Sequence, residues 1–242
     1  MTLPYINSDK SKCDQVALMF DNIAPRYDFL NHFLSQGTDK CWRRKLSKKS
    51  NICNTDIVLD IATGTGDLAI ELSKRKPEKI FGIDISEQML IIASEKINKR
   101  NLQNIIELKY GNAEDIQFDD NYFNLVTISF GIRNFENIDK SLKEILRVLK
   151  PNGCLMILEF SKSRIFPVKQ LFTLYFKYLL PMLGRMLSKD IRAYKYLTES
   201  VEAFPEGENF IEILAKAGFI NISRKRLSGG IASLYISQKR KF

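Results

Sequence analysis

Metal-binding and redox side chains are scarce in this chain of 242 residues, which has one histidine and four cysteines. The cysteines are widely spaced and form no Cys-x-x-Cys pair; they are Cys13, Cys41, Cys53 and Cys154. Zinc sites need several closely spaced Cys and His ligands, and disulfide frameworks belong mainly to short secreted chains. We therefore expect free thiols in a reducing compartment and no metal site, and we expect His32 to pack or cap rather than catalyse.

Long hydrophobic runs are also absent. The most apolar stretch, 171–187, is interrupted by Lys177, Pro181 and Arg185, whereas a transmembrane helix needs about 20 apolar residues in a row. The N-terminus has no apolar core of the kind found in secretory signals. The sequence thus predicts a cytoplasmic protein that does not span a bilayer.

Acidic residues are fewer than basic ones, 28 against 37, which gives a formal net charge of +9. Such an excess can serve nucleic acid or an anionic membrane surface, or can be no more than a lysine-rich exterior. The chain has no zinc-finger spacing, no aromatic RNP-type strand and no basic helix with heptads. Nucleic acid is therefore not an expected partner.

Residues 55–160 alternate short apolar runs with amphipathic helices. Strands are expected at 57–60, 79–84, 105–110, 124–130 and 154–159, with helices at 67–74, 87–100 and 138–149. This alternation is typical of an α/β fold with a parallel sheet covered on both faces, and right-handed crossovers make it doubly wound.

The two ends of the chain depart from this rhythm. Residues 12–48 are predicted to be helical, with Pro25 ending the first helix. Strands 219–226 and 231–238 are joined by a Ser-Gly-Gly turn and predict an antiparallel hairpin. We expect an N-terminal helical lid at 1–50, then a cofactor-binding domain at 51–242 with a helical insertion at about 161–204.

A glycine-rich turn between the first strand and the first crossover helix is the clearest cofactor signal. Asp60 ends the strand, Gly64 and Gly66 follow, and Asp84 comes 20 residues after Gly64. Ligands of such sheets bind beyond the carboxyl ends of the strands, and an acidic residue at this distance binds ribose hydroxyls. The pattern by itself fits both an NAD-dependent dehydrogenase and a methyltransferase that uses S-adenosylmethionine (SAM).

Three further features favour SAM. Asp67, in the turn, would repel a pyrophosphate at the helix N-terminus. The polar loop Gly111-Asn-Ala-Glu-Asp115 follows the third strand, where adenine would lie. The terminal hairpin matches class I SAM-dependent methyltransferases, whose doubly wound, mostly parallel seven-stranded sheet carries a C-terminal antiparallel strand.

Three longer stretches resemble one family. They are Met19-Phe-Asp-Asn-Ile-Ala-Pro-Arg-Tyr-Asp28, Ser129-Phe-Gly-Ile-Arg-Asn134 and the run from Arg147 to Ser161. From about residue 16 to 239 the chain closely resembles the ubiquinone/menaquinone biosynthesis C-methyltransferases. Two positions depart from the family pattern, Asn152 in the Lys-Pro-x-Gly turn and Asp39 before the tryptophan.

The resemblance implies a reaction and a set of site residues. SAM would methylate a ring carbon of a prenylated hydroquinone, with demethylmenaquinol favoured over the benzoquinol of ubiquinone biosynthesis. The positions expected to bind the cofactor, with those of the glycine-rich turn included, are Asp60, Thr63, Gly64, Gly66, Asp84, Asn112, Ala113 and Ser129. Arg133 is assigned phenolate stabilisation with Asn134 as its polar partner, and Tyr27 and Asn31 are assigned to the lid over the ring. A surface ion pair between Arg133 and Glu136 is the alternative for that arginine.

The segment 161–204 is aromatic and strongly basic, with eight basic and two acidic residues up to Ser200. An apolar helix with a cationic face can lie on an anionic membrane, which would keep a prenyl tail near the lipid. A cap helix or a homodimer contact is the alternative. Methylation of another lipid-like acceptor and a noncatalytic scaffold remain competing functions, although the intact cofactor residues argue against the scaffold.

Overall fold

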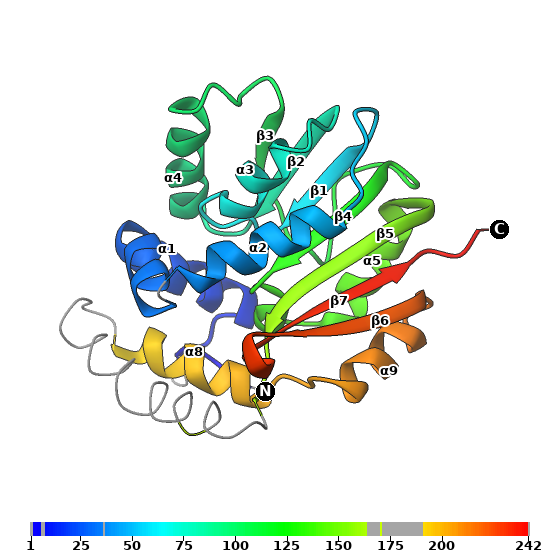
Figure 1. Cartoon of the computed structure of the whole chain (residues 1–242). Helices are drawn as coiled ribbons and strands as arrows, with labels where there is room; N and C mark the ends of the chain where they lie inside the picture. The colour runs from blue at the N-terminus through cyan, green and yellow to red at the C-terminus, as the bar shows by residue number, and fades with distance from the viewer. Residues whose placement is uncertain (1, 6–7, 36, 164–169, 171–190, 242) are drawn as a thin grey trace.

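The computed structural model describes residues 2–5, 8–35, 37–163, 170 and 191–241, and its centre is one seven-stranded sheet (Figure 1). The strands are β1 (Ile57–Ile61), β2 (Lys79–Asp84), β3 (Ile106–Tyr110), β4 (Phe123–Ser129), β5 (Leu149–Phe160), β6 (Ile220–Leu227) and β7 (Ala232–Gln238). Their order is β3-β2-β1-β4-β5-β7-β6, with β1 to β5 parallel and β7 antiparallel to both β5 and β6. The predicted doubly wound sheet with an antiparallel C-terminal strand is confirmed.

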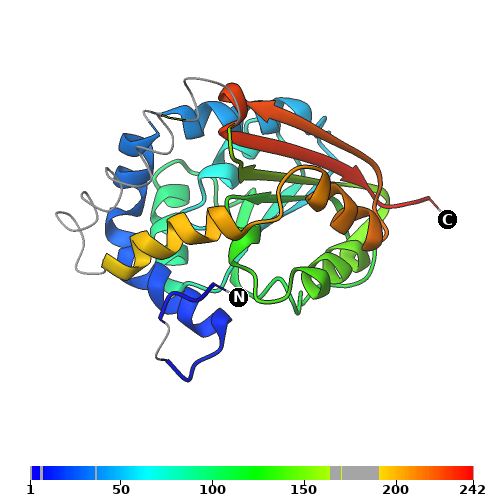
Figure 2. The same ribbon diagram turned by 90° about the horizontal axis from the view of Figure 1, so that it is seen from below.

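Helices cover both faces of the sheet, as Figure 2 shows from below. One face packs against α2 (Thr38–Lys49), α3 (Asp67–Ser73) and α4 (Glu87–Asn98), and the other against α5 (Ile138–Val148) and α9 (Glu208–Lys216). Side chains alternate between the faces along a strand. In β1, Val58 therefore joins the first cluster, while Leu59 and Ile61 join the second.

Local signals in the sequence explain where several elements begin. The side chain of Ser86 accepts a hydrogen bond from Met89 N and so begins α4, and that of Asn137 does the same for α5 through Lys140 N, as N-cap residues do. The strand β5 begins at Leu149 rather than at 154, because Leu149 already pairs with Phe123 ahead of a shift in register.

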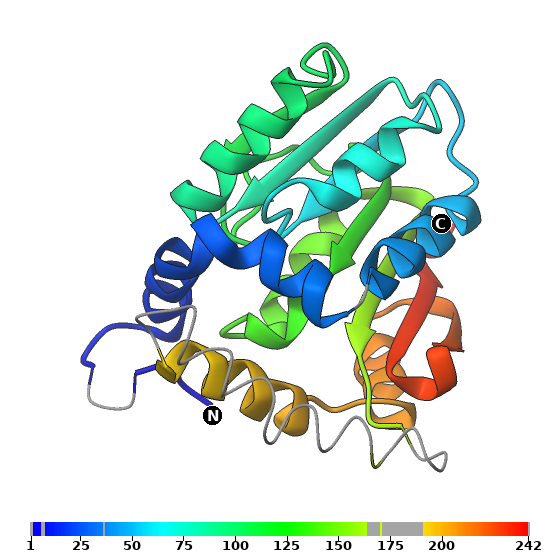
Figure 3. The same ribbon diagram turned by 60° about the vertical axis from the view of Figure 1, so that its left-hand side comes forward.

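The N-terminal helix α1 runs without a break over Lys12–Leu34, so the prediction that Pro25 ends it is wrong. Proline removes one backbone hydrogen bond from a helix interior. Burial offsets this cost, because Met19 and Ile23 of α1 pack with Met89 of α4 and Tyr196 of α8 (Ile191–Ala203). Figure 3 shows α1 and α8 at the same end of the sheet.

In the part of the chain that the structure describes, no helix has both the length and the apolar character needed to cross a bilayer. Most of the basic, aromatic segment predicted at 161–204 lies outside that part, since only 161–163, 170 and 191–204 are described.

Candidate active site

The glycine-rich turn lies between β1 and α3 and needs left-handed backbone at both glycines. Gly64 has φ of +56° and Gly66 has φ of +78°. A Cβ on Gly66 would lie 3.2 Å from Cβ of Ala93 in α4, whereas Gly64 has open space at its Cα and lines a pocket at the carboxyl ends of the strands. Gly66 therefore lets the turn pack against α4, and Gly64 leaves room for a ligand.

Asp84 ends β2 at the wall of this pocket. One carboxylate oxygen accepts a hydrogen bond from Gly64 N at 2.8 Å, and the other accepts one from Ser86 N at 2.9 Å. Each carboxylate oxygen can accept more than one hydrogen bond. Asp84 can thus hold the turn in place and still bind a vicinal diol.

Asp60 and Thr63 hold the glycine-rich turn in place and are not among the residues that line the pocket. Asp60 is buried and accepts hydrogen bonds from the hydroxyls of Thr63 and Thr127, each at 2.7 Å. Thr63 N also donates to the carbonyl of Ile83 at 3.0 Å. These two predicted cofactor residues therefore fix the shape of the turn through their side chains.

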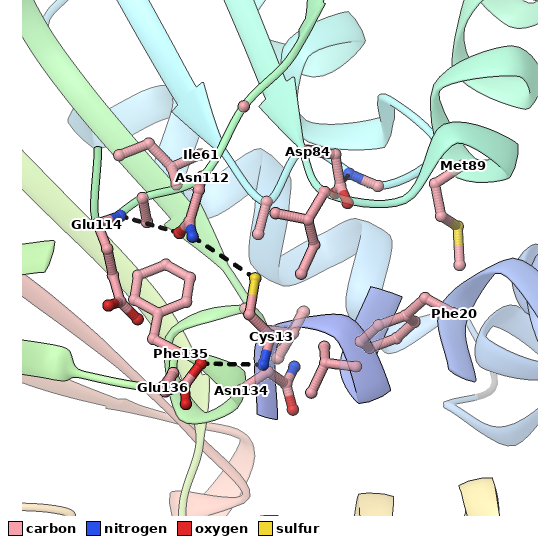
Figure 4. A pocket seen from close by; sticks show the side chains of 18 of the residues that line it. Cys13, Phe20, Ile61, Asp84, Met89, Asn112, Glu114, Asn134, Phe135 and Glu136 are labelled. Carbon is pink, nitrogen blue, oxygen red and sulfur yellow. Dashed lines mark hydrogen bonds between the residues drawn. The ribbon is translucent and has the colours of Figure 1, made fainter. Parts of the chain in front are cut away.

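Residues at the ends of β3 and β4 also line the pocket, namely Asn112, Ala113 and Ser129, and Figure 4 shows Asn112 on the same side as Asp84. The side-chain oxygen of Asn112 accepts a hydrogen bond from Glu114 N at 3.0 Å, which orients the amide. The hydroxyl of Ser129 is buried and has no hydrogen-bond partner. Since buried polar groups are normally paired, Ser129 fits a ligand with a polar group at this point.

Two strand ends meet closely at the base of the pocket. Ala62 follows β1 with φ of 52° and Phe130 follows β4 with φ of 60°, a conformation that costs energy for residues other than glycine. A Cβ on Gly131 would lie 2.5 Å from the Cβ of Ala62. Only a glycine at 131 allows this approach of the two loops.

Helix α1 closes the pocket on its remaining side, and most of this wall was not predicted. The residues of α1 that line the pocket are Cys13, Val16, Phe20 and Tyr27. Figure 4 shows Cys13 and Phe20 across from Asp84 and Asn112. The sequence predicted Tyr27 here; Val16 and Phe20 lie on one face of the predicted helix, a pattern that indicated the helix and not a pocket. Asn31 also belongs to α1, but its side chain lies outside the described residues.

A polar cluster joins α1 to the glycine-rich turn. The ammonium of Lys96 on α4 contacts Asp28 of α1 at 2.8 Å, the hydroxyl of Thr65 at 3.0 Å, and Asp67. Thr65 in turn donates to Asp28 at 2.5 Å, and Arg43 of α2 lies 3.5 Å from Asp67. Asp67 is thus paired with two cations, but Lys96 also pairs with Asp28 and Arg43 also pairs with Asp39. The cluster holds three carboxylates against two cations, so repulsion of a pyrophosphate by Asp67 stays a prediction.

We expect Lys96→Met to weaken cofactor binding about fivefold, because the turn and α1 lose their shared cation. The pairs are partly exposed, so an effect on the order of 1 kcal/mol is appropriate. Lys99→Met is the matched control, since Lys99 lies on the same helix and its side chain is 77% exposed. Calorimetric titration of both variants measures the difference, and equal affinities would contradict this role of Lys96.

Arg133 lies in the short helix η1 (Ile132–Asn134) after β4 and is buried. Its Nη1 donates to Glu159 Oε1 at 2.7 Å and to the carbonyl of Phe130 at 2.6 Å. The alternative of a surface pair with Glu136 is wrong, because Glu136 is exposed and accepts a hydrogen bond from Cys13 N instead. Arg133 is not among the residues lining the pocket, whereas its predicted partner Asn134 is, with Oδ1 buried and unpaired.

The pocket should respond to pH in the weakly acidic range. Burial raises the pKa of both Asp60 and Asp84 to about 6, although hydrogen bonds from their neighbours lower it. A carboxyl whose pKa is raised by folding favours the folded state below its unfolded pKa of about 4, and that contribution is lost as pH rises through about 6. Binding of a diol by Asp84 would have the opposite dependence on pH, because it would need the ionised carboxylate.

We therefore expect the affinity for SAM to fall as pH drops from 7.5 through about 6. Isothermal titration across this range measures the effect, and Asp84→Asn should bind weakly with a smaller dependence on pH. An affinity that stays constant or improves on acidification would contradict the account.

Comparison with known proteins places these features in a family. The sequence profile of the ubiE/COQ5 methyltransferase family matches residues 8–239. A demethylmenaquinone methyltransferase of Bacteroides fragilis is 45% identical over 237 residues, covering 98% of this chain and 96% of that protein. A ubiquinone/menaquinone biosynthesis C-methyltransferase of Geotalea daltonii is 43% identical, covering 94% and 97%.

The fold agrees with a solved structure of a putative SAM-dependent methyltransferase from Methanococcus maripaludis. That structure has a TM-score of 0.67 and 21% identity, covering 98% of this chain and 99% of the other. The sequence profile and the full-length relatives agree with the resemblance found in the sequence. The chain belongs to the ubiE/COQ5 methyltransferase family.

Proposed function

We propose that this protein transfers the methyl group of SAM to a ring carbon of reduced demethylmenaquinone. The observation that carries the proposal is a single pocket in which cofactor residues at the carboxyl ends of β1 to β4 face an apolar wall from α1. The Bacteroides fragilis relative, named demethylmenaquinone methyltransferase and 45% identical over nearly the whole chain, supports this acceptor.

The residues of the pocket fit SAM. Asp84 would accept hydrogen bonds from the ribose hydroxyls, and the loop at Asn112 and Ala113 would contact the adenine. Gly64 and Ser129 would approach the remainder of the cofactor, with the unpaired hydroxyl of Ser129 supplying a polar contact. Asp60, Thr63 and Gly66 hold the turn in the required shape.

Aromatic side chains provide a place for the acceptor ring. Phe20 and Tyr27 of α1 lie edge to face, with ring centroids 5.9 Å apart, and both line the pocket together with Phe130 and Phe135. Aromatic groups pack well against a quinol ring. We propose that α1 and α2 form the lid over this ring, with Asn31 of α1 as a further contact.

The chemistry then requires alignment and an activated ring. SAM supplies an electrophilic methyl group when it is bound. The pocket aligns the ring carbon with that group, and such positioning accounts for much of the rate of a displacement reaction. The ring carbon becomes nucleophilic when the neighbouring hydroxyl loses its proton. Asn134 would contact this oxygen through its unpaired side chain, and the positive charge of Arg133 would stabilise the phenolate.

Side-by-side assays test the acceptor. Purified protein would be incubated in detergent with SAM and either reduced demethylmenaquinol or the benzoquinol precursor of ubiquinone, and the products identified by mass spectrometry. We expect methylation of the naphthoquinol to dominate. Exclusive methylation of the benzoquinol would move the protein to the ubiquinone branch, and transfer to neither would direct the search to other lipid-like acceptors.

We also propose that the protein meets its prenylated substrate at an anionic membrane surface. The excess of basic residues and the apolar, basic composition of 161–204 support this. Co-sedimentation with anionic liposomes should therefore occur and should weaken with salt. Absence of lipid-dependent sedimentation would favour the alternative, in which the segment caps the fold or joins a homodimer.

A further inference from the structure

Four buried side-chain atoms in the described part of the chain have no hydrogen-bond partner; three belong to residues at or just after the ends of β4 and β5, and the fourth belongs to α8, on a residue that interacts electrostatically with Arg133 and Glu159. They are Ser129 Oγ, Asn134 Oδ1, Glu159 Oε2 and Tyr196 Oη. Buried polar atoms without partners are rare in native proteins. Two of them line the cofactor pocket, and the proposed function does not yet use the other two, on Glu159 and Tyr196.

Glu159 is fully buried near the end of β5 and is satisfied on one oxygen only. Its Oε1 accepts hydrogen bonds from Arg133 Nη1 at 2.7 Å and from Phe160 N at 2.8 Å. Arginine and carboxylate often pair through two parallel hydrogen bonds. Here the arginine is turned aside, because its Nη1 also donates to the Phe130 carbonyl and its Nε to Ser200 Oγ at 3.3 Å. Oε2 of Glu159 is therefore buried without a hydrogen-bond partner.

Glu159 and Tyr196 do not themselves line the pocket, and Glu159 is connected to it through Arg133. One guanidinium nitrogen of Arg133 donates both to Glu159 and to the carbonyl of Phe130, a residue that lines the pocket. The ring centroids of Phe130 and Phe160 lie 4.5 Å apart. Tyr196 approaches from α8 and is 1% exposed. Among the described residues, the charged or titratable groups that act on Glu159 and Tyr196 are Arg133 and these two residues themselves.

Resting on the function proposed above, we infer that Glu159 is the catalytic base, accepting the hydroxyl proton of the bound hydroquinone on its free oxygen, with the hydroxyl of Tyr196 hydrogen-bonded to the same ring oxygen. The O–H bond breaks and its proton moves to Oε2, while its electron pair stays with the ring. The adjacent ring carbon then forms a bond to the methyl group as the methyl–sulfur bond breaks, leaving that electron pair on sulfur. The proton on the methylated carbon leaves to solvent, and Glu159 returns its own proton to the ring oxygen, so one proton is released overall.

The arrangement gives Arg133 a role that changes during the reaction. Before proton transfer its positive charge neutralises the Glu159 carboxylate. After transfer Glu159 is neutral, and the charge of Arg133 becomes available to the phenolate in a site shielded from water, where such stabilisation is strong. Burial raises the pKa of Glu159 while Arg133 lowers it, and a base works best when its pKa is near the working pH.

The test compares Glu159→Gln with Glu144→Gln. Glu144 is a matched control, because it also pairs with an arginine, Arg147, at 2.8 Å, but the side chains of that pair bond no described residue that lines the pocket, whereas Arg133 bonds Phe130. We expect Glu159→Gln to lower kcat by about 100-fold or more with little change in the Kd of SAM, and Glu144→Gln to retain its kcat. A Glu159→Gln variant with the kcat of the unmodified protein would overturn the inference.

A second measurement separates proton transfer from a structural effect. Quinol analogues with electron-withdrawing substituents have more acidic hydroxyls, so the deficit of Glu159→Gln should shrink as the hydroxyl becomes more acidic. An equal deficit with every analogue would assign Glu159 a structural role only and overturn the inference. If the variant does not fold, the pH dependence of kcat of the unmodified protein tests the inference instead. At saturating SAM its kcat should fall on acidification with demethylmenaquinol and stay level with an acceptor that is already ionised.

The two proposals fail in different ways. Absence of transfer from the unmodified protein to any quinol would overturn the proposed function, and the role of Glu159 with it. Transfer by the unmodified protein together with an active Glu159→Gln variant would overturn the role of Glu159 alone.

Discussion

Replacing Asp84 by alanine should lower the affinity for SAM by about 100-fold. The carboxylate is buried at the pocket wall and accepts hydrogen bonds from Gly64 N at 2.8 Å and Ser86 N at 2.9 Å, and in the proposed complex it would accept two more from the ribose. Hydrogen bonds to a charged group contribute about 1.5–3 kcal/mol each, and about 1.4 kcal/mol corresponds to a tenfold change in affinity. Loss of two such bonds, with release of the turn, accounts for the expected effect.

Calorimetric titration with SAM measures this change. Asp119→Ala is a suitable control, because Asp119 is exposed in the loop before β4 and is not among the residues that line the pocket. If Asp84→Ala binds SAM within a few-fold of the unmodified protein, the cofactor does not lie against β2 as proposed.

Replacing Arg133 by methionine should lower the free energy of unfolding by about 3–5 kcal/mol, because it leaves the carboxylate of Glu159 buried without its partner. Both side chains are almost inaccessible, with 4% of Arg133 and none of Glu159 exposed. Denaturant unfolding monitored by circular dichroism measures the change. Folded Arg133→Met should still bind SAM but turn over slowly, since its pocket residues are intact and its phenolate is not stabilised.

A double variant identifies the cause. Adding Glu159→Gln to Arg133→Met removes the unpaired charge and should recover much of the lost stability. Arg147→Met, which breaks a more exposed pair with Glu144, should cost clearly less, since 31% of the Arg147 side chain is accessible. If the double variant is no more stable than Arg133→Met, the loss arises from packing around the arginine and not from the buried charge.

Local patterns made the sheet and the glycine-rich turn predictable. A strand, Gly64 and Gly66, and an acidic residue 20 positions later specify one arrangement because strand ends meet at one edge of a parallel sheet. Asp84 therefore lies beside Gly64, as the spacing indicated. The antiparallel end of the sheet followed in the same way from two strands and a Ser-Gly-Gly turn.

Tertiary contacts were beyond the sequence patterns. The pair of Arg133 and Glu159 joins residues 26 positions apart on different elements, while Glu136 was the nearest candidate in sequence. Asp67 was judged by its place in the turn, although Lys96 from α4 pairs with it. Packing contacts also allow α1 to continue through Pro25, and Cys13 and Phe20 of this helix line the pocket. In each case the deciding partner came from a distant part of the chain.

The most direct test of the account is transfer of a deuterated methyl group. Purified protein would be given SAM labelled with CD₃ and reduced demethylmenaquinol in detergent, and the product examined by mass spectrometry and NMR. The account predicts a CD₃ group on the ring carbon next to a hydroxyl. A label on a hydroxyl oxygen, or no transfer under conditions in which SAM binds, would contradict it.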